Sequence, residues 1–169
     1  LCKIGKPDVF FTEFMNVEGY CSVGKDKVDH RIQFSEIERP IVIQLWGNVP
    51  EDFAKTVREI KELKPDGFDI NMGCAVRNVI NTGGGSALIK EPELAKEIIK
   101  AVKQEAGDIP VSVKTRLGYS TVDTENWIGL LQNQGLDMLT GQGRIAKDSY
   151  AIPSRWDEIQ KVVRMRNEI

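Results

Sequence analysis

Short apolar segments alternate with amphipathic segments along almost the whole chain, and this alternation limits the possible folds more than any other feature. The apolar segments are rich in β-branched or aromatic residues and are bounded by glycine or proline, which is typical of buried strands. We predict strands at residues 8–12, 40–46, 67–72, 110–116 and 136–140. Buried strands that alternate with helices indicate a parallel α/β sheet.

The segments between these strands carry their apolar residues at helical spacing. We predict helices over residues 51–63, 92–104, 123–134 and 155–168, each with one apolar stripe. Ser154 and Asp157 have the spacing of a capping box at the start of the last helix. Residues 16–39 are polar and contain glycine, so we expect a loop there with one short helix.

Two architectures fit five parallel strands: an open doubly wound sheet, and part of a (β/α)8 barrel. A complete barrel needs eight strands and about 250 residues, whereas this chain has 169 residues. Composition does not decide between the two. No repeat, linker or low-complexity segment divides the chain, so we expect one domain over residues 1–169. Because the first residue is Leu rather than Met, we expect the chain to be a piece of a longer protein.

Composition and charge exclude several classes of protein. Hydrophobic residues make up 41% and charged residues 28% of the chain, which is ordinary for a soluble globular protein. The net charge of −2 argues against a general polycationic nucleic-acid binder. The sequence has no apolar run of membrane-spanning length and no signal peptide, so we expect no membrane contact. Three cysteines at wide, irregular spacing predict a reducing cytoplasm rather than disulfides or a zinc site.

The carboxyl ends of the predicted strands are unusually polar, and functional groups of parallel α/β folds gather there. The fourth strand places Lys114 and Arg116 on one face, where two buried cations are costly unless each meets an anion or a polar ligand. One interpretation pairs them with Asp69 on the neighbouring strand, and the other assigns them to a ligand. Cys74 follows Gly73 just past the third strand, where its thiol can act as an acid or a nucleophile.

Three weaker signals lie elsewhere. The glycine run 83–85 before Ser86 could cradle a phosphate, but for this run alone we favour flexible-turn glycines. His30 is the only histidine and lies away from every strand end, so we predict an exposed residue without a functional role. A catalytic triad or a His-based metal site therefore finds little support. We expect Cys2 and Cys21 to be small buried hydrophobic residues.

A set of motifs in the chain resembles the motifs of the tRNA-dihydrouridine synthase family, both in their order and in their spacing. The motifs are Gln44-Leu-Trp-Gly47, Asp69-Ile-Asn-Met-Gly-Cys74, Gly83-Gly-Gly-Ser-Ala-Leu88, Val113-Lys-Thr-Arg-Leu-Gly118 and Gly143-Arg144, followed by Trp156. Thr12-Glu-Phe-Met15 resembles the second-strand motif of that family. The resemblance implies an FMN-binding TIM barrel. Residues 1–169 would then be roughly its strands two to six. The first strand, the last two strands and a C-terminal helical tRNA-binding domain would lie outside the chain.

The resemblance also implies a reaction. It is the FMN-dependent reduction of uridine to 5,6-dihydrouridine in tRNA, with NADPH as the reductant. The resemblance implies that the reduced flavin transfers hydride to C6 of the base and that Cys74 donates a proton to C5. The resemblance implies that Gln44, Lys114 and Gln142 bind the cofactor. It implies that Asn71, Arg116 and Arg144 bind the substrate. The full-length protein is expected to be monomeric, cytoplasmic and free of metal, and the isolated chain to be inactive.

Two positions depart from the family pattern. Ala75 stands where the family usually has proline, and Gln142 stands where it usually has a flavin-contacting histidine. Gln142 must therefore serve as a hydrogen-bond donor, or the contact is lost. Two alternatives stay open: another FMN barrel reductase that acts on a free pyrimidine, and a non-catalytic relic of the family, which these departures favour.

Overall fold

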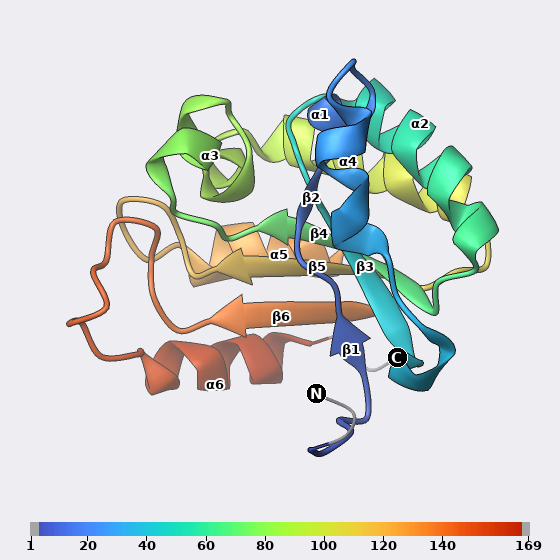
Figure 1. Ribbon diagram of the computed structural model, residues 1–169. Coiled ribbons are helices and arrows are strands. Elements are labelled where there is room, and N and C mark those ends of the chain that lie inside the picture. The colour runs from blue at the N-terminus through green and yellow to red at the C-terminus, as the bar shows by residue number, and fades with distance from the viewer. Residues whose placement is uncertain (1–3, 167–169) are drawn as a thin grey trace.

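The chain, seen in a computed structural model that describes residues 4–166, is built on one parallel sheet. Its strands follow the order β1-β3-β4-β5-β6, with β2 also paired to β3 (Figure 1). The spatial order of the strands therefore follows their order in the chain, as in a barrel. In a doubly wound sheet the spatial order instead reverses direction partway along the chain. The described part of the chain is therefore part of a (β/α)8 barrel and not an open doubly wound sheet.

The strands agree with the sequence prediction in number and position. β1 (Phe10–Phe11) and β2 (Met15–Asn16) pair with the two halves of β3 (Ile41–Trp46), so they act as one interrupted edge strand. The remaining strands are β4 (Gly67–Met72), β5 (Val111–Arg116) and β6 (Met138–Gln142). The two edges differ from the prediction, because β1 is shorter than the predicted 8–12, β2 lies outside that range, and β6 begins and ends two residues later than predicted.

The helices also follow the apolar periodicity. They are α1 (Val17–Tyr20), α2 (Pro50–Ile60), α3 (Arg77–Asn81), α4 (Pro92–Ala106), α5 (Gly129–Gln132) and α6 (Trp156–Met165). Pro50 and Pro92 begin their helices, where the missing N–H of proline removes no hydrogen bond. The helix predicted over 123–134 consists of a π-helical turn (Thr124–Ile128) and α5. Besides α1, residues 16–39 hold three 3₁₀ turns, at Lys25–Lys27, Asp29–Ile32 and Glu36–Glu38.

The capping box predicted at the start of α6 is wrong. The N-cap of this helix is Arg155, and among the described residues no side chain caps it. The backbone N–H of Arg155 donates to the carbonyl of Gly143 (2.7 Å), which draws this residue toward the end of β6 and starts the helix one residue later than expected. Residues 167–168 of the predicted helix lie outside the described residues.

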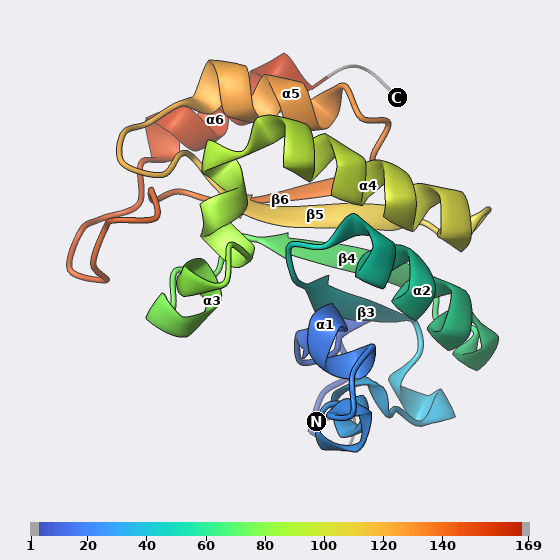
Figure 2. The same cartoon turned by 90° about the horizontal axis from the view of Figure 1, so that it is seen from above.

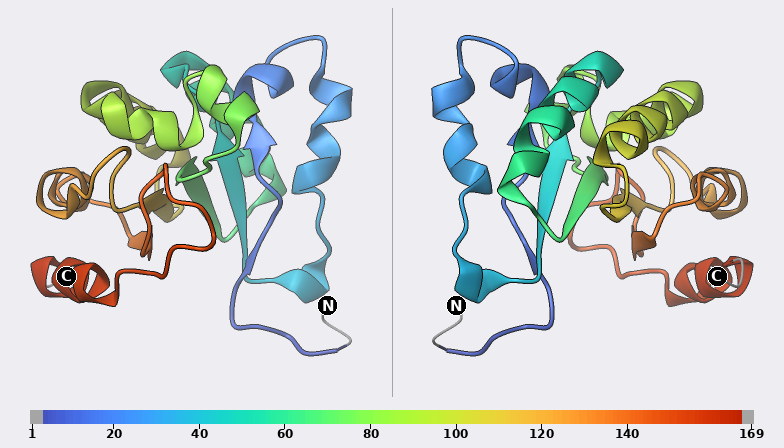
Figure 3. Two further views of the ribbon diagram at one scale, coloured as in Figure 1. Left: turned by 90° about the vertical axis from the view of Figure 1, so that its left-hand side faces the viewer. Right: turned by 90° about the vertical axis from the view of Figure 1, so that its right-hand side faces the viewer.

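The hydrophobic core lies between the sheet and its helices. Strand residues on one face, among them Ile43, Phe68, Ile70 and Val113, are fully buried against α2 and α4, which contribute Phe53 and Ile98. Seen from above, α2, α4 and α5 lie along the outer side of the curved sheet (Figure 2). The two edges carry different elements, with α1 and the turns after it at one edge and α6 at the other (Figure 3). The opposite, concave face of the sheet is free for polar side chains.

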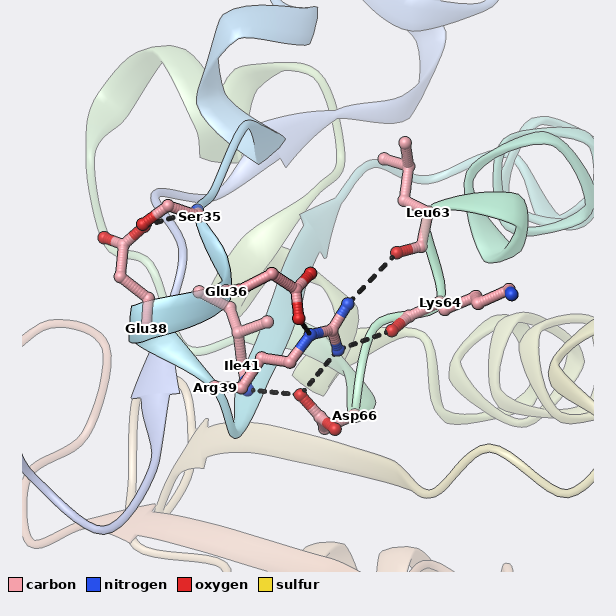
Figure 4. A network of polar contacts seen from close by, with 8 residues as sticks. All are labelled: Ser35, Glu36, Glu38, Arg39, Ile41, Leu63, Lys64 and Asp66. Carbon is pink, nitrogen blue, oxygen red and sulfur yellow. Dashed lines mark hydrogen bonds and ion pairs between the residues drawn. The ribbon is translucent and has the colours of Figure 1, made fainter.

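A separate polar network closes the edge of the sheet at which β3 and β4 begin (Figure 4). Arg39 donates from Nη1 to the carbonyl of Lys64 (2.7 Å) and to Oδ2 of Asp66 (3.0 Å), and from Nε to Glu36 (2.8 Å). Asp66 also accepts from the backbone N–H of Ile41 (2.8 Å). One guanidinium thus joins the turn before β3 to the segment that follows α2, at the end of the sheet remote from the carboxyl edge.

Candidate active site

The concave face of the sheet is polar near the carboxyl ends of the strands. Side chains alternate between faces, and the strand register places Asn71 beside Lys114 and Arg116 beside Gln142. The side chains of this polar face are Gln44, Asp69, Asn71, Ser112, Lys114, Arg116 and Gln142. The arrowheads of β4, β5 and β6 point to one side of the molecule, where α3 and the loop after β6 lie (Figure 1).

A cavity of about 520 Å³ opens at this edge. It is lined by Phe14, Gln44, Asn71, Gly73, Cys74, Ala75, Val76, Lys114, Arg116, Gln142, Ala146, Asp148, Ser149 and Tyr150. The structure therefore brings together six of the seven residues that the sequence singled out, and only Arg144 is not among them. Another hollow, of about 500 Å³, lies between α4 and the end of α5, but surface side chains of mixed charge line it and no strand end reaches it.

Cys74 is held by hydrogen bonds to its backbone on both sides. The side-chain oxygen of Asn71 accepts from the N–H groups of Gly73 (3.1 Å) and Cys74 (2.9 Å). The carbonyl of Cys74 accepts from the N–H of Ser86 (2.9 Å). The cysteine is half-buried and lines the cavity. The turn therefore presents the thiol to the cavity while the backbone around it is fixed.

The glycine run packs against this turn and does not form a phosphate cradle. The N–H groups of Gly83, Gly84 and Ser86 donate to the carbonyls of Ile80, Val79 and Cys74, so they are not available to an anion. Gly85 has a φ of +58°, and a Cβ there would lie 2.7 Å from the Cys74 carbonyl oxygen. Only glycine fits this conformation and this space. The run thus allows the chain to pass closely beside Cys74.

Beneath the cavity, three neighbouring strands contribute one buried polar cluster. Asp69 accepts from Nε2 of Gln44 (2.7 Å) and from the hydroxyl of Ser112 (2.5 Å). The Gln44 carbonyl oxygen in turn accepts from Nδ2 of Asn71 (3.1 Å). Burial raises the pKa of the Asp69 carboxyl, although the two hydrogen bonds and the charge of Lys114 act in the opposite direction.

The ion-pair interpretation of the two strand cations is wrong, at least within the described residues. There Lys114 is exposed toward the cavity and forms no ion pair. Arg116 is buried and donates instead to two carbonyls, from Nε to Gly73 (2.7 Å) and from Nη1 to Ile145 (3.1 Å). Burial lowers the pKa of its guanidinium. Of the two strand cations, Lys114 is therefore the more open to a ligand, although Arg116 also lines the cavity.

Arg144 lies beside the cavity rather than on its wall. It donates to the carbonyls of Ile152 (2.6 Å) and Tyr150 (3.4 Å), and its guanidinium lies 5.9 Å from the centre of the Tyr150 ring. It thus shapes the loop after β6, from which Asp148 and Tyr150 reach the cavity. These two residues and Phe14 were not predicted as site residues, because loop residues follow no periodicity. The available signals were the family-like motif that contains Phe14 and the aromatic character of Tyr150 in a polar segment.

The remaining candidates lie away from the cavity. His30 is exposed, as predicted. Cys21 is half-buried rather than buried, since it lies at the start of the turn after α1, and its thiol contacts Thr56 (3.5 Å) and the carbonyl of Asp52 (3.6 Å) of α2. Burial raises the pKa of this thiol. Cys2 lies outside the described residues.

Over residues 4–166 no group of three or more His, Cys, Asp or Glu side chains is arranged to hold a metal ion. Among the helices described there, none combines the length and the apolar character that crossing a bilayer needs.

The sheet order and the cavity define a barrel enzyme scaffold with its polar groups at the carboxyl edge. Comparison with known proteins gives the family. The sequence model of the family described as "Dihydrouridine synthase (Dus)" matches residues 1–169, and the chain belongs to this family. This confirms the resemblance inferred from the motifs.

Individual relatives are similar over nearly the whole chain. Identity is 45% with a protein named "Probable tRNA-dihydrouridine synthase 2" of Bacillus subtilis (strain 168). It is 42% with proteins named "Probable tRNA-dihydrouridine synthase" of Staphylococcus aureus (strain COL) and Staphylococcus epidermidis (strain ATCC 12228 / FDA PCI 1200). Each match covers 99% of this chain but 51% of the relative. The chain thus spans about half the length of the curated relatives it matches.

Proposed function

We propose that the full-length protein reduces uridine to 5,6-dihydrouridine in tRNA, as a cytoplasmic monomer that uses FMN and takes its electrons from NADPH. The observation that carries this proposal is the meeting of Cys74, Lys114 and Gln44 in one cavity of a dihydrouridine synthase chain. The names of the relatives support tRNA as the substrate. A base-modifying enzyme of this kind needs its target nucleotide turned out of the stack, into such a cavity.

The residues present fit a flavin. The cavity volume of about 520 Å³ falls within the range of small-molecule sites. Gln44 and Lys114 would hold the polar edge of the flavin ring, because an exposed ammonium without an ion pair among the described residues suits the negative charge of a reduced flavin. Gln142 would donate a further hydrogen bond from β6. When bound and reduced, FMN supplies the hydride for C6 of the uracil.

Cys74 supplies the proton. Cys74 lines the cavity from a turn that Asn71 holds. The proton moves from Sγ to C5 of the base, and the thiolate then regains a proton from water. Asn71 and Arg116 would bind the base, and Arg144 would support the loop on the opposite wall.

The experiment compares single variants of the full-length protein on a tRNA transcript. Cys74→Ala should leave FMN content and NADPH oxidation nearly intact, because neither needs the thiol. Dihydrouridine formation should fall by about 10²–10³-fold, the usual contribution of a positioned general acid. Lys114→Ala should differ by lowering flavin affinity as well, since the lysine acts on the cofactor.

The matched control is Cys21→Ala, which changes a half-buried cysteine outside the cavity. It should leave dihydrouridine formation unchanged. A Cys74→Ala protein that forms dihydrouridine at the wild-type rate would contradict the proposed acid. Reduction of free uracil by an enzyme that ignores tRNA would identify a free-pyrimidine reductase instead.

A further inference from the structure

Asp69 is the one fully buried carboxylate in the wall beneath the cavity, and the proposed reaction does not use it. Its side chain has no exposed surface, and the strand register sets it between Gln44 on β3 and Ser112 on β5. Both donors to its oxygens are neutral, and within residues 4–166 no cation lies within ion-pair distance of it. A buried carboxyl without a cationic partner is costly. An apolar residue of similar size could be buried here at a lower cost in free energy. Packing alone therefore does not explain why the position is a carboxylate.

The carboxylate fixes which way the Gln44 amide faces. A carboxylate oxygen accepts hydrogen bonds and does not donate them. The NH2 group of Gln44 must therefore turn toward Asp69, and the distance between Nε2 and Oδ2 is 2.7 Å. The amide oxygen of Gln44 then faces Asn71, whose Nδ2 donates to it at 3.1 Å.

The orientation of Gln44 in turn fixes the orientation of Asn71, which contacts the backbone of Cys74. Because Nδ2 of Asn71 faces Gln44, its Oδ1 faces the turn after β4, where it accepts from the N–H groups of Gly73 and Cys74. One carboxylate thus determines the direction of two successive amides and of the backbone that carries the thiol. If the Gln44 amide rotated by half a turn, its oxygen would face a carboxylate oxygen of Asp69 and its NH2 group would face Nδ2 of Asn71, so neither hydrogen bond would form.

We propose that Asp69 is a positioning residue that orients Gln44 and, through Asn71, holds Cys74 in place. The proposal rests on the proposed function for its catalytic meaning, but the positioning itself can be measured without turnover. Asp69 does not line the cavity, so it acts only through these two side chains.

The test uses the rate of Cys74 alkylation by iodoacetamide in the full-length protein, followed by peptide mass spectrometry. Asp69→Leu removes the acceptor at similar volume, so the turn loosens. Cys74 alkylation should then rise about fivefold to tenfold, the factor that corresponds to the loss of about one hydrogen bond. Alkylation of Cys21 in the same sample should stay at the wild-type rate, because its contacts are with α2.

Asp69→Asn serves as the rescue variant. Gln44 can only donate from Nε2, whereas the Ser112 hydroxyl can donate or accept. An asparagine at this position must therefore present its oxygen to Gln44 and its NH2 group to Ser112, and the direction of both amides is kept. Cys74 alkylation in Asp69→Asn should stay within about twofold of wild type.

Gln44→Met, which breaks the chain of amides while Asp69 stays, covers the case in which Asp69→Leu fails to fold. It should accelerate Cys74 alkylation to a similar extent. Wild-type alkylation rates in both Asp69→Leu and Gln44→Met would overturn the proposal, and so would equal acceleration of Cys21 and Cys74, which marks general loosening of the fold. Selective acceleration of Cys74 in a protein that makes no dihydrouridine would uphold the positioning and reject the proposed function.

Discussion

The side-chain oxygen of Asn71 lies 2.9 Å from the backbone nitrogen of Cys74, and it accepts the N–H of Gly73 as well. One amide oxygen therefore satisfies two donors of the tight turn that follows β4. Because both bonds end on the same atom, one side chain of the preceding strand holds the N-terminal side of the cysteine, while the N–H of Ser86 holds its carbonyl.

Asn71→Ala removes the acceptor of both N–H groups. Leaving a buried donor without a partner costs about 1–3 kcal/mol, so we expect the free energy of unfolding to fall by an amount in that range. Urea denaturation followed by circular dichroism measures the change in the full-length protein. Asn81→Ala, on the exposed end of α3, is the matched control and should change stability by less than about 0.5 kcal/mol.

Gly85→Ala should disturb the cysteine turn from the other side. A Cβ at this position would lie 2.7 Å from the Cys74 carbonyl oxygen and 2.8 Å from Cγ1 of Val79. Such overpacking costs about 1–3 kcal/mol beyond the strain of a positive φ. Gly135→Ala is the control, because its φ of +62° is similar but a Cβ there would meet only the far end of the long Lys103 side chain. Equal melting temperatures for the two variants would contradict this account.

Arg39→Ala should destabilise the protein although it lies far from the cavity. Its guanidinium donates to the carbonyl of Lys64 and to Asp66, which also caps the backbone of Ile41 (Figure 4). We expect a lower urea midpoint with unchanged flavin binding. Arg58→Ala, which removes a more exposed arginine paired with Glu105, should lower the midpoint by less. The reverse order would show that the Arg39 network contributes little.

The isolated chain of 169 residues should bind FMN far more weakly than the full-length protein. Gln44 and Lys114 offer partners to the flavin ring, but we expect the phosphate-binding loops to lie in the other half of the protein. Charge-assisted contacts are worth roughly 1.5–3 kcal/mol each, so the loss of several weakens binding by orders of magnitude. Quenching of FMN fluorescence measures the two dissociation constants. Micromolar binding by the isolated chain would place the phosphate site within residues 1–169.

The isolated chain should also self-associate. β1 and β6 are the outer strands of the sheet, and Phe11 and Met138 are 43% and 44% exposed there. Unpaired strand edges beside apolar side chains favour association between copies. Light scattering should show particle size rising with concentration, and the double variant Phe11→Thr, Met138→Thr should reduce the rise. A stable monomer with a sharp melting transition would contradict this prediction.

Much of the sheet could be predicted from the sequence, because its strands are short, apolar and bounded by glycine or proline. The segment from Gly67 to Met72 was predicted to the residue. The choice between a barrel and an open sheet could not be made in this way, since it depends on which strands are neighbours. The motifs resolved that choice through the family resemblance, and the strand order confirms it.

The site was predictable where it lies on strands. Lys114 and Arg116 follow from strand alternation, Gln44 and Asn71 follow from the family resemblance, and all four line the cavity. Contacts between distant segments were not predictable. The run 83–85 was open to two interpretations because nothing in its own sequence shows that Cys74 lies against it. For the same reason, the partners of Arg116 could not be foreseen, since both are backbone carbonyls that no sequence pattern marks.

Arg116 has a consequence for how the two loops beside the cavity can vary. Its guanidinium joins the carbonyl of Gly73, after β4, to the carbonyl of Ile145, after β6. The covalent width of one planar group therefore helps to set the gap between these loops, together with Asp148, whose side chain accepts from the N–H of Ile145 (3.0 Å). Substitutions in the loop after β6 that spare Asp148 should leave that gap unchanged. A lysine in place of Arg116 has a single nitrogen and cannot span it.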